Sequence, residues 1–122
     1  MKKLIISMKS TKDLFDNFSK VWKKIESGKA PKEPHFEISF QDKKDYDRFV
    51  KNIYILMLIL KFKPKSIYEL ARVAQMDLSN IKKIIKFFEE LGAVKIKERN
   101  IGGKQVKTPL VEYSKIEFDL VA

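Results

Sequence analysis

Two short stretches in the first third of the chain carry the hydrophobic pattern of β-strands. Residues 3–8 are largely apolar and rich in β-branched side chains. In residues 35–40, Phe36, Ile38 and Phe40 recur at every second position, which is typical of a half-buried strand. We therefore expect one strand in each segment.

The segment between these strands has helical spacing instead. Ser10 and Asp13 resemble a capping box, and Gly28 supplies a residue that can stop a helix. Residues 29–34 contain two prolines and predict a linker. The apolar positions of the expected amphipathic helix are Leu14, Phe15, Phe18, Val21, Trp22 and Ile25.

Two consecutive helices are predicted over residues 43–50 and 52–62. Asp42 or Gln41 caps the first helix. The second helix is apolar on nearly all sides, which indicates burial over most of its surface, and Pro64 ends it. The residues of the first helix expected to face inward are Tyr46, Phe49 and Val50.

A short helix, a turn and a longer helix follow. Ser66 and Glu69 form a capping box for residues 67–74, and Ser79 is the expected N-cap of a helix over residues 79–91. The apolar stripe of the longer helix consists of Ile81, Ile84, Ile85, Phe88 and Leu91.

After Gly92 the pattern returns to alternation. Residues 93–99 and 104–110 predict two strands of a hairpin around a turn at residues 100–103. Residues 113–120 predict a final strand with one apolar face.

The order of helices and hairpin over residues 52–110 predicts a winged helix-turn-helix. The expected fold class is therefore α+β. We expect an N-terminal strand-helix extension and linker in residues 1–34, and a winged helix-turn-helix domain with a C-terminal strand in residues 35–122.

The positive charge is concentrated in the same region. The chain has 26 Lys and Arg against 16 Asp and Glu, which gives a net charge of +10. Residues 51–107 hold 13 basic and 5 acidic side chains, a local excess of +8. Lysines that only improve solubility would be spread more evenly, so this asymmetry favours an anionic partner, most often nucleic acid.

Two sets of side chains are candidates for binding DNA. The outer face of the helix over residues 79–91 is expected to enter the major groove, where Asn80 can contact adenine and lysines can contact guanine. The hairpin is expected to grip the DNA backbone with the residues that flank its tip. A merely solvated lysine face is the alternative interpretation. The predicted DNA-binding residues are Ser79, Asn80, Lys82, Lys83, Lys86, Arg99 and Lys104.

Few residues are suited to catalysis. The chain has no cysteine, which excludes thiol chemistry. Its single histidine, His35, disfavours a histidine-based metal site or acid–base pair. Asp42, Asp45 and Asp47 alternate with cations, as is typical of a helix N-terminus. The longest apolar run, residues 53–60, is far shorter than the roughly 20 residues of a membrane span. We expect a cytoplasmic binding protein that is not an enzyme, with no catalytic residue, metal, cofactor or membrane partner.

Several motifs resemble a known family of regulators. They are SIYELAR at residues 66–72, MDLSNIKK at residues 76–83 and ELGAV at residues 90–94. These segments, with residues 34–40 and 113–118, are similar to small prokaryotic, largely archaeal, MarR-like winged-helix proteins. Members of that family often carry a His-Arg-Asp run where this chain has Lys82, Lys83 and Ile84, so a different operator is expected.

The resemblance implies a transcriptional regulator that binds double-stranded DNA sequence-specifically. A homodimer is expected because a single recognition helix gives limited affinity. Its candidate surfaces are the helix that carries Phe15, Phe18 and Trp22, and the strand over residues 113–120. The alternative is a protein-interaction module, or an antitoxin that binds a toxin partner and autoregulates its operon, as the resemblance implies for some members.

Overall fold

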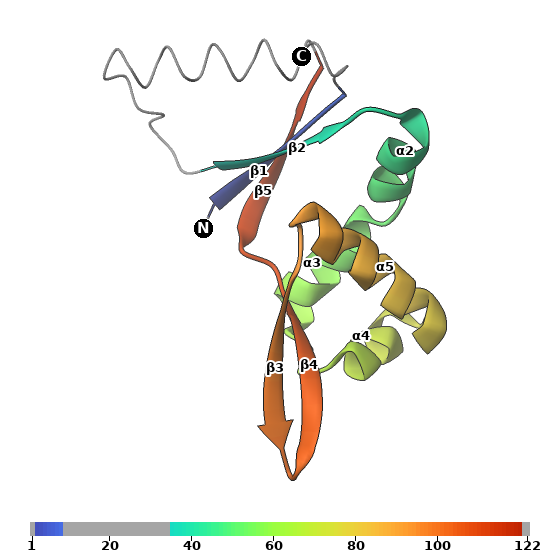
Figure 1. The fold of residues 1–122 in the computed structure, drawn as a ribbon, viewed down its shortest axis with the longest axis vertical. Coiled ribbons are helices and arrows are strands. Elements are labelled where there is room, and N and C mark those ends of the chain that lie inside the picture. The colour runs from blue at the N-terminus through green and yellow to red at the C-terminus, as the bar shows by residue number, and fades with distance from the viewer. Residues whose placement is uncertain (1, 9–34, 121–122) are drawn as a thin grey trace, which may run out of the picture. The chain divides into compact units, whose positions relative to one another are not determined.

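The structure, a computed structural model, describes residues 2–8 and 35–120 (Figure 1). Its architecture is mixed α+β, with helices and two separate sheets, which confirms the predicted class. The chain divides into two compact units. Unit 1 comprises Met1–Asp47 and Tyr113–Ala122, and unit 2 comprises Arg48–Glu112. The predicted helix over residues 10–28 and the linker over residues 29–34 lie outside the described residues.

Unit 1 contains a parallel sheet of three strands. They are β1 (Lys2–Met8), β2 (His35–Phe40) and β5 (Tyr113–Asp119), in the order β2-β1-β5. All three predicted strands are therefore confirmed. β1 lies in the centre and pairs with both neighbours. The expected boundary between residues 34 and 35 consequently falls inside unit 1, because β1 and β2 belong to one sheet.

The two faces of this sheet differ in polarity. On one face Leu4 and Ile6 are fully buried, and Ile6 lies opposite Ile38 and Phe118 in the neighbouring strands. On the other face the buried Ser7 donates a hydrogen bond of 3.0 Å to Glu37 Oε1. β1 thus carries both the apolar contacts and the polar contacts that hold its neighbours in register.

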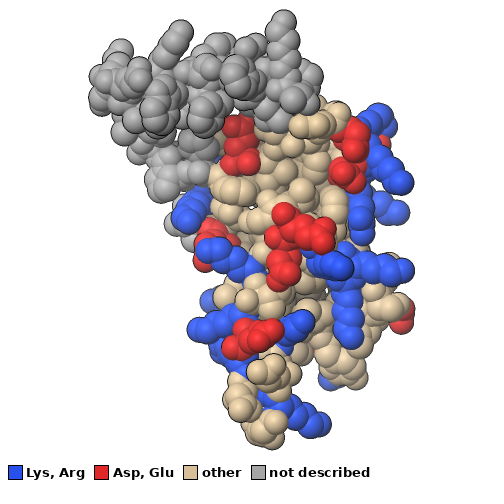
Figure 2. Space-filling view, viewed as in Figure 1, with Lys and Arg blue, Asp and Glu red and all other residues tan. Residues whose placement is uncertain are grey.

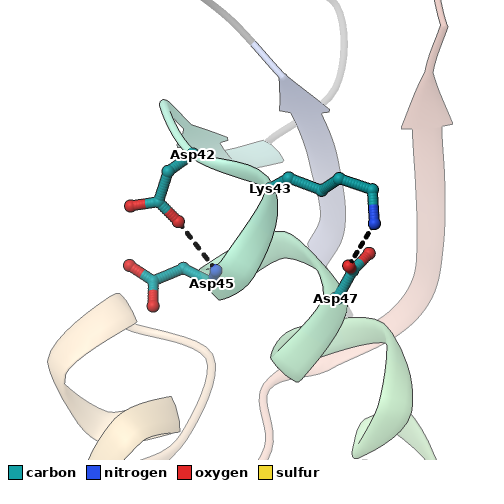
Figure 3. Close-up of polar contacts among 4 residues, drawn as sticks. All are labelled: Asp42, Lys43, Asp45 and Asp47. Atoms are coloured by element: carbon teal, nitrogen blue, oxygen red, sulfur yellow. Dashed lines mark hydrogen bonds and ion pairs between the residues drawn. The ribbon is translucent and has the colours of Figure 1, made fainter.

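Helix α2 (Lys43–Lys51) starts with a side-chain cap (Figure 3). The Asp45 backbone N–H donates to Asp42 Oδ1 at 2.8 Å, so Asp42 is the cap, one of the two predicted. Lys43 Nζ lies 2.6 Å from Asp47 Oδ2. The hydrogen bond to Asp47 and its negative charge raise the pKa of Lys43. The inward orientation predicted for Val50 is wrong, because 42% of its surface is exposed.

Unit 2 contains three further helices. They are α3 (Ile53–Phe62), α4 (Ile67–Ala74) and α5 (Leu78–Leu91). Ser66 is the N-cap of α4, as predicted, since its Oγ accepts a 3.0 Å hydrogen bond from the Glu69 backbone N–H. The Glu69 carboxylate in turn accepts from the Lys65 backbone N–H at 3.2 Å.

The core of unit 2 is built around the apolar stripe of α5. Phe88 is fully buried and packs edge-to-face against Phe49 of α2, with 5.5 Å between the ring centroids. The other predicted stripe residues are buried as well, except the half-buried Leu91, and Phe87 joins them. The Arg48 guanidinium covers the Phe87 ring at 4.3 Å. The buried stripe consists of Ile81, Ile84, Ile85, Phe87 and Phe88.

The burial predicted for α3 is wrong. Only Ile55, Leu56 and Ile59 are buried, whereas Met57 and Phe62 are among its exposed residues. An apolar helix is buried only where other elements pack against it, and α3 contacts mainly α4 and strand β4. One side of the helix is therefore left open.

A hairpin completes unit 2. Strands β3 (Lys95–Ile101) and β4 (Lys104–Leu110) pair antiparallel around Gly102 and Gly103. Both glycines have positive φ angles, 60° and 80°, as a tight two-residue hairpin turn requires. The turn is thus shorter than predicted, because Asn100 and Ile101 extend β3.

None of the helices that the structure describes is both long enough and apolar enough to cross a membrane. The cytoplasmic location stays a prediction.

Candidate nucleic-acid interface

Helix α5 presents a continuous stripe of polar and cationic side chains. Ser79, Lys82, Lys83 and Lys86 are all exposed and follow the spacing i, i+3, i+4, i+7, which places them on one side of the helix. We call these four residues the cationic stripe. The helix buries its opposite side in the core of unit 2, so the stripe faces solvent.

Asn80 lies at the edge of this stripe. It is exposed, but helical spacing places it in line with Lys83 and the buried Phe87. The expectation that Asn80 would share the outer face with the three lysines is thus only partly met. Its position in the first turn still leaves its amide accessible from the N-terminal end of α5.

The start of α5 differs from the prediction. The helix begins at Leu78 with Asp77 as N-cap, so Ser79 is a helical residue rather than the cap. Ser79 Oγ donates a hydrogen bond to the Asp77 carboxylate, and no side chain caps the backbone N–H groups. Asp77 therefore places one negative charge beside the cationic stripe, which the sequence pattern did not indicate.

Charge is ordered along α5. The first turn has no acidic residue and the last turn has no basic one. The three lysines occupy the middle of the helix, whereas Glu89 and Glu90 lie near its end. A helix dipole favours the opposite order, with acids first and bases last. This arrangement concentrates positive potential toward the N-terminal end of α5 without stabilising the helix.

The lysines of the stripe are available to a ligand. Within the part of the chain that the structure describes, no ion pair involves Lys82, Lys83 or Lys86. In Figure 2, Lys and Arg side chains gather over the region of α5 and along the hairpin. A surface cation that forms no ion pair can attract an anionic partner.

The hairpin has one cationic face. Side chains alternate along a strand, so Lys97 and Arg99 point to one side of β3. Lys104 pairs with Ile101, two residues beyond Arg99, and therefore shares that side. We call Lys97, Arg99 and Lys104 the cationic hairpin face. Lys95 lies on the same side, but its Nζ is 3.1 Å from the Glu112 carboxylate.

The other side of the hairpin is close to neutral. There Glu98 lies opposite Lys107, and Asn100 lies opposite Gln105. The two predicted hairpin residues, Arg99 and Lys104, are thus brought together near the tip. Lys97 is not among the predicted DNA-binding residues, but the period of two places it on the same side as Arg99.

A partly buried hydrogen bond connects the hairpin to the segment before α4. Thr108 of β4 is buried, and its Oγ1 donates to the Lys65 carbonyl oxygen at 2.6 Å. Lys65 directly precedes the N-cap of α4. Pro64 and Pro109 are buried beside this contact. Thr108 could not be identified from sequence because its partner is 43 residues away.

The two cationic surfaces both belong to unit 2. In Figure 1 the hairpin extends below the helices, and α4 lies between the hairpin and the N-terminal end of α5. Among the described residues, no group of carboxylate or imidazole side chains is arranged to hold a metal ion.

Comparison with known proteins identifies the family of this chain. The family profile described as HVO_A0114 matches residues 50–118, more than half of the chain. The chain belongs to the HVO_A0114 family. The matched span holds α3, α4, α5, the hairpin and most of β5, so both cationic surfaces are part of what the HVO_A0114 profile matches. No curated protein and no solved structure matches the chain. Nothing in the match indicates the MarR-like regulators that the motifs resemble.

Proposed function

We propose that this member of the HVO_A0114 family is a winged-helix protein that binds double-stranded DNA sequence-specifically and regulates transcription. In this proposal α5 is the recognition helix, and its first two turns enter the major groove. The hairpin is the wing and contacts the sugar-phosphate backbone. The order α3, α4, α5, β3, β4 supports the proposal because it is the order of elements in a winged helix.

The cationic stripe carries the proposal. An exposed helix surface with three lysines that form no ion pair with the described residues fits the width and the negative potential of the major groove. Lys82 and Lys83 are placed to donate to guanine, and Asn80 reaches bases from the first turn. Lys86 lies farther along α5 and is assigned to phosphate.

The central experiment is selection of duplexes from a random DNA pool, followed by fluorescence anisotropy over a series of salt concentrations. We expect a defined consensus and an affinity that falls steeply with salt, with a log–log slope of about −0.9 per phosphate neutralised. Lys82→Ala with Lys83→Ala should weaken binding to the consensus by about 1–3 kcal/mol for each hydrogen-bonded base that the variant no longer reaches. Asn80→Ala should relax the sequence preference.

A matched control separates the stripe from overall charge. Lys44→Ala with Lys115→Ala removes the same two charges from exposed positions of unit 1. This control should bind nearly as well as the unaltered protein. A flat salt response, no consensus, or equal weakening in the two double variants would contradict the proposal.

A homodimer that engages two half-sites remains a prediction. One candidate surface, around Phe15, Phe18 and Trp22, lies outside the described residues. For the other, β5, one edge is already paired with β1 of the same chain.

A further inference from the structure

Helix α3 exposes an apolar surface that the proposed DNA interface does not use. Met57 is 63% exposed, Phe62 51% and Tyr54 43%. Leu58 is half-buried between them. Large apolar side chains exposed together mark a binding surface more often than scattered single ones do.

These residues form one stripe along the helix. Positions 54, 57, 58, 61 and 62 follow the spacing i, i+3, i+4, i+7, i+8. Tyr54, Met57 and Lys61 lie on the side of α3 away from the buried Ile55 and Ile59, whereas Leu58 and Phe62 lie at the edge of the stripe nearer to Ile55. We call this set the α3 outer face. It consists of Tyr54, Met57, Leu58, Lys61 and Phe62.

The segment of the chain that carries this face is cationic. Residues 51–65 contain four lysines and no acidic residue. Lys61 Nζ lies 5.4 Å from the centre of the Phe62 ring, so one of these charges lies directly on the apolar surface. This surface belongs to a different helix from the cationic stripe of α5.

We infer that the α3 outer face docks an acidic amphipathic helix of a partner protein. Methionine and aromatic residues are enriched at the centres of protein interfaces, where charged residues are depleted. A helix that presents Leu or Phe at i, i+3, i+4 and i+7 would fill the apolar centre. Glu and Asp beside those positions would pair with Lys51, Lys61, Lys63 and Lys65 at the rim.

Charge disfavours two other occupants of this face, a second copy of the protein and its own residues 9–34. A symmetric contact with a second copy would bring the same four lysines face to face. Residues 9–34 hold seven Lys against four Asp and Glu, so that segment also has the wrong sign.

Single-stranded nucleic acid fits the rim but not the centre. Its bases stack on aromatic rings, and the lysines would attract its phosphates. However, the aliphatic Met57 and Leu58 lie between Tyr54 and Phe62, so successive rings do not form a continuous stacking platform. The aliphatic centre therefore favours a protein partner.

The four methionines of the chain provide a sharp test. The full-length protein is labelled at the methionine methyl groups and titrated with a synthetic amphipathic peptide of about 14 residues, the length of four helical turns, that carries Leu, Phe and Glu. We expect the Met57 methyl signal to shift and saturate, while the Met8 and Met76 signals stay in place. The same peptide with Lys in place of Glu should bind at least about tenfold more weakly.

Reversing the charge of two lysines at the rim of the α3 outer face is the second part of the test. Lys61→Glu with Lys63→Glu leaves two cations and two anions at the rim and should abolish the preference for the acidic peptide, whereas Lys44→Glu with Lys115→Glu in unit 1 should leave it unchanged. An unchanged Met76 signal shows that the variant remains folded. The inference is overturned if Met57 does not respond to the acidic peptide, or responds equally to both peptides.

Two further outcomes would identify a different occupant and overturn the inference. One is a Met57 shift with oligothymidylate but not with the acidic peptide. The other is self-association of the protein in sedimentation that Met57→Glu abolishes. Neither result depends on whether α5 binds duplex DNA.

Discussion

The two units of this protein differ in how far their positive charges are balanced by acidic residues. Unit 1 holds 12 Lys and Arg against 10 Asp and Glu, a net charge of +2, whereas unit 2 holds 14 against 6, a net charge of +8. In unit 1 the described ion pairs join Lys3 to Glu117 and Lys43 to Asp47. In unit 2 the acids are too few to pair with most of the cations. Positive charge is therefore nearly balanced by acidic residues in unit 1 and largely unbalanced in unit 2.

The largest expected effect is on the stability of unit 2, whose core supports its cationic surface. Phe88→Ala removes a fully buried ring that packs on Phe49, and should lower the free energy of unfolding by about 3–5 kcal/mol. Urea denaturation followed by circular dichroism measures the change. Phe118→Ala in unit 1 is the control, since that ring is 38% exposed and should cost about 1 kcal/mol. Equal destabilisation by the two variants would contradict the central place of Phe88 in the core.

The next effect concerns the cationic hairpin face. Under the proposed function, Arg99→Ala with Lys104→Ala should weaken binding to all duplexes by about 2 kcal/mol and reduce the salt slope by about 1.8, because two fewer phosphates are neutralised. Anisotropy titrations at several salt concentrations give both quantities. Lys107→Ala removes a cation from the opposite side of the hairpin and should change the slope far less. A larger effect of Lys107 would contradict the assignment of the faces.

A smaller effect is expected at the base of the hairpin. Thr108→Val keeps the shape of the side chain but leaves the Lys65 carbonyl without this donor, which should destabilise unit 2 by about 1 kcal/mol. Thermal unfolding measures the change. Thr108→Ser retains the hydroxyl and should recover much of the stability. If Thr108→Ser were as damaging as Thr108→Val, packing of the methyl group would be the cause rather than the hydrogen bond.

The smallest expected effect comes from removing one acidic charge from unit 2, which would widen the difference in net charge between the two units. Asp77 is the acid nearest the N-terminal end of the cationic stripe, and Asp77→Asn removes its charge while keeping a residue that is favoured at an N-cap. If α5 approaches phosphates, DNA affinity should rise by about 0.5 kcal/mol at low ionic strength and less at high salt. Glu90→Gln, near the other end of α5, is the comparison and should matter less. A lower affinity of Asp77→Asn would indicate that Asp77 contacts the DNA bases.

Local signals explain which elements could be predicted. The Ser66 cap, the helix stop at Gly92 and the turn glycines Gly102 and Gly103 act within a few residues. Patterns of this range identified the strands and α4, and most of α5. The predicted start of α5 is wrong because Ser79 and Asp77 are both favoured N-cap residues, and local pattern alone does not decide between them.

Long-range packing explains what could not be predicted. The pairing of β1 with β5 joins residues more than 100 positions apart, and no local pattern specifies it. The apolar sequence of α3 likewise could not reveal that only one side is covered. For the candidate site, helical periodicity was enough to group Lys82, Lys83 and Lys86, but the Thr108 anchor and the edge position of Asn80 required the structure.

The central place of β1 has a consequence for how the chain folds during synthesis. Unit 2 is one continuous segment, so all of its partners have emerged once residue 112 has left the ribosome. Strand β1 precedes unit 2 in the chain, whereas one of its two neighbours, β5, follows it. Unit 2 can therefore fold while one edge of β1 still lacks its partner. The sheet of unit 1 is completed only after β5 has been made.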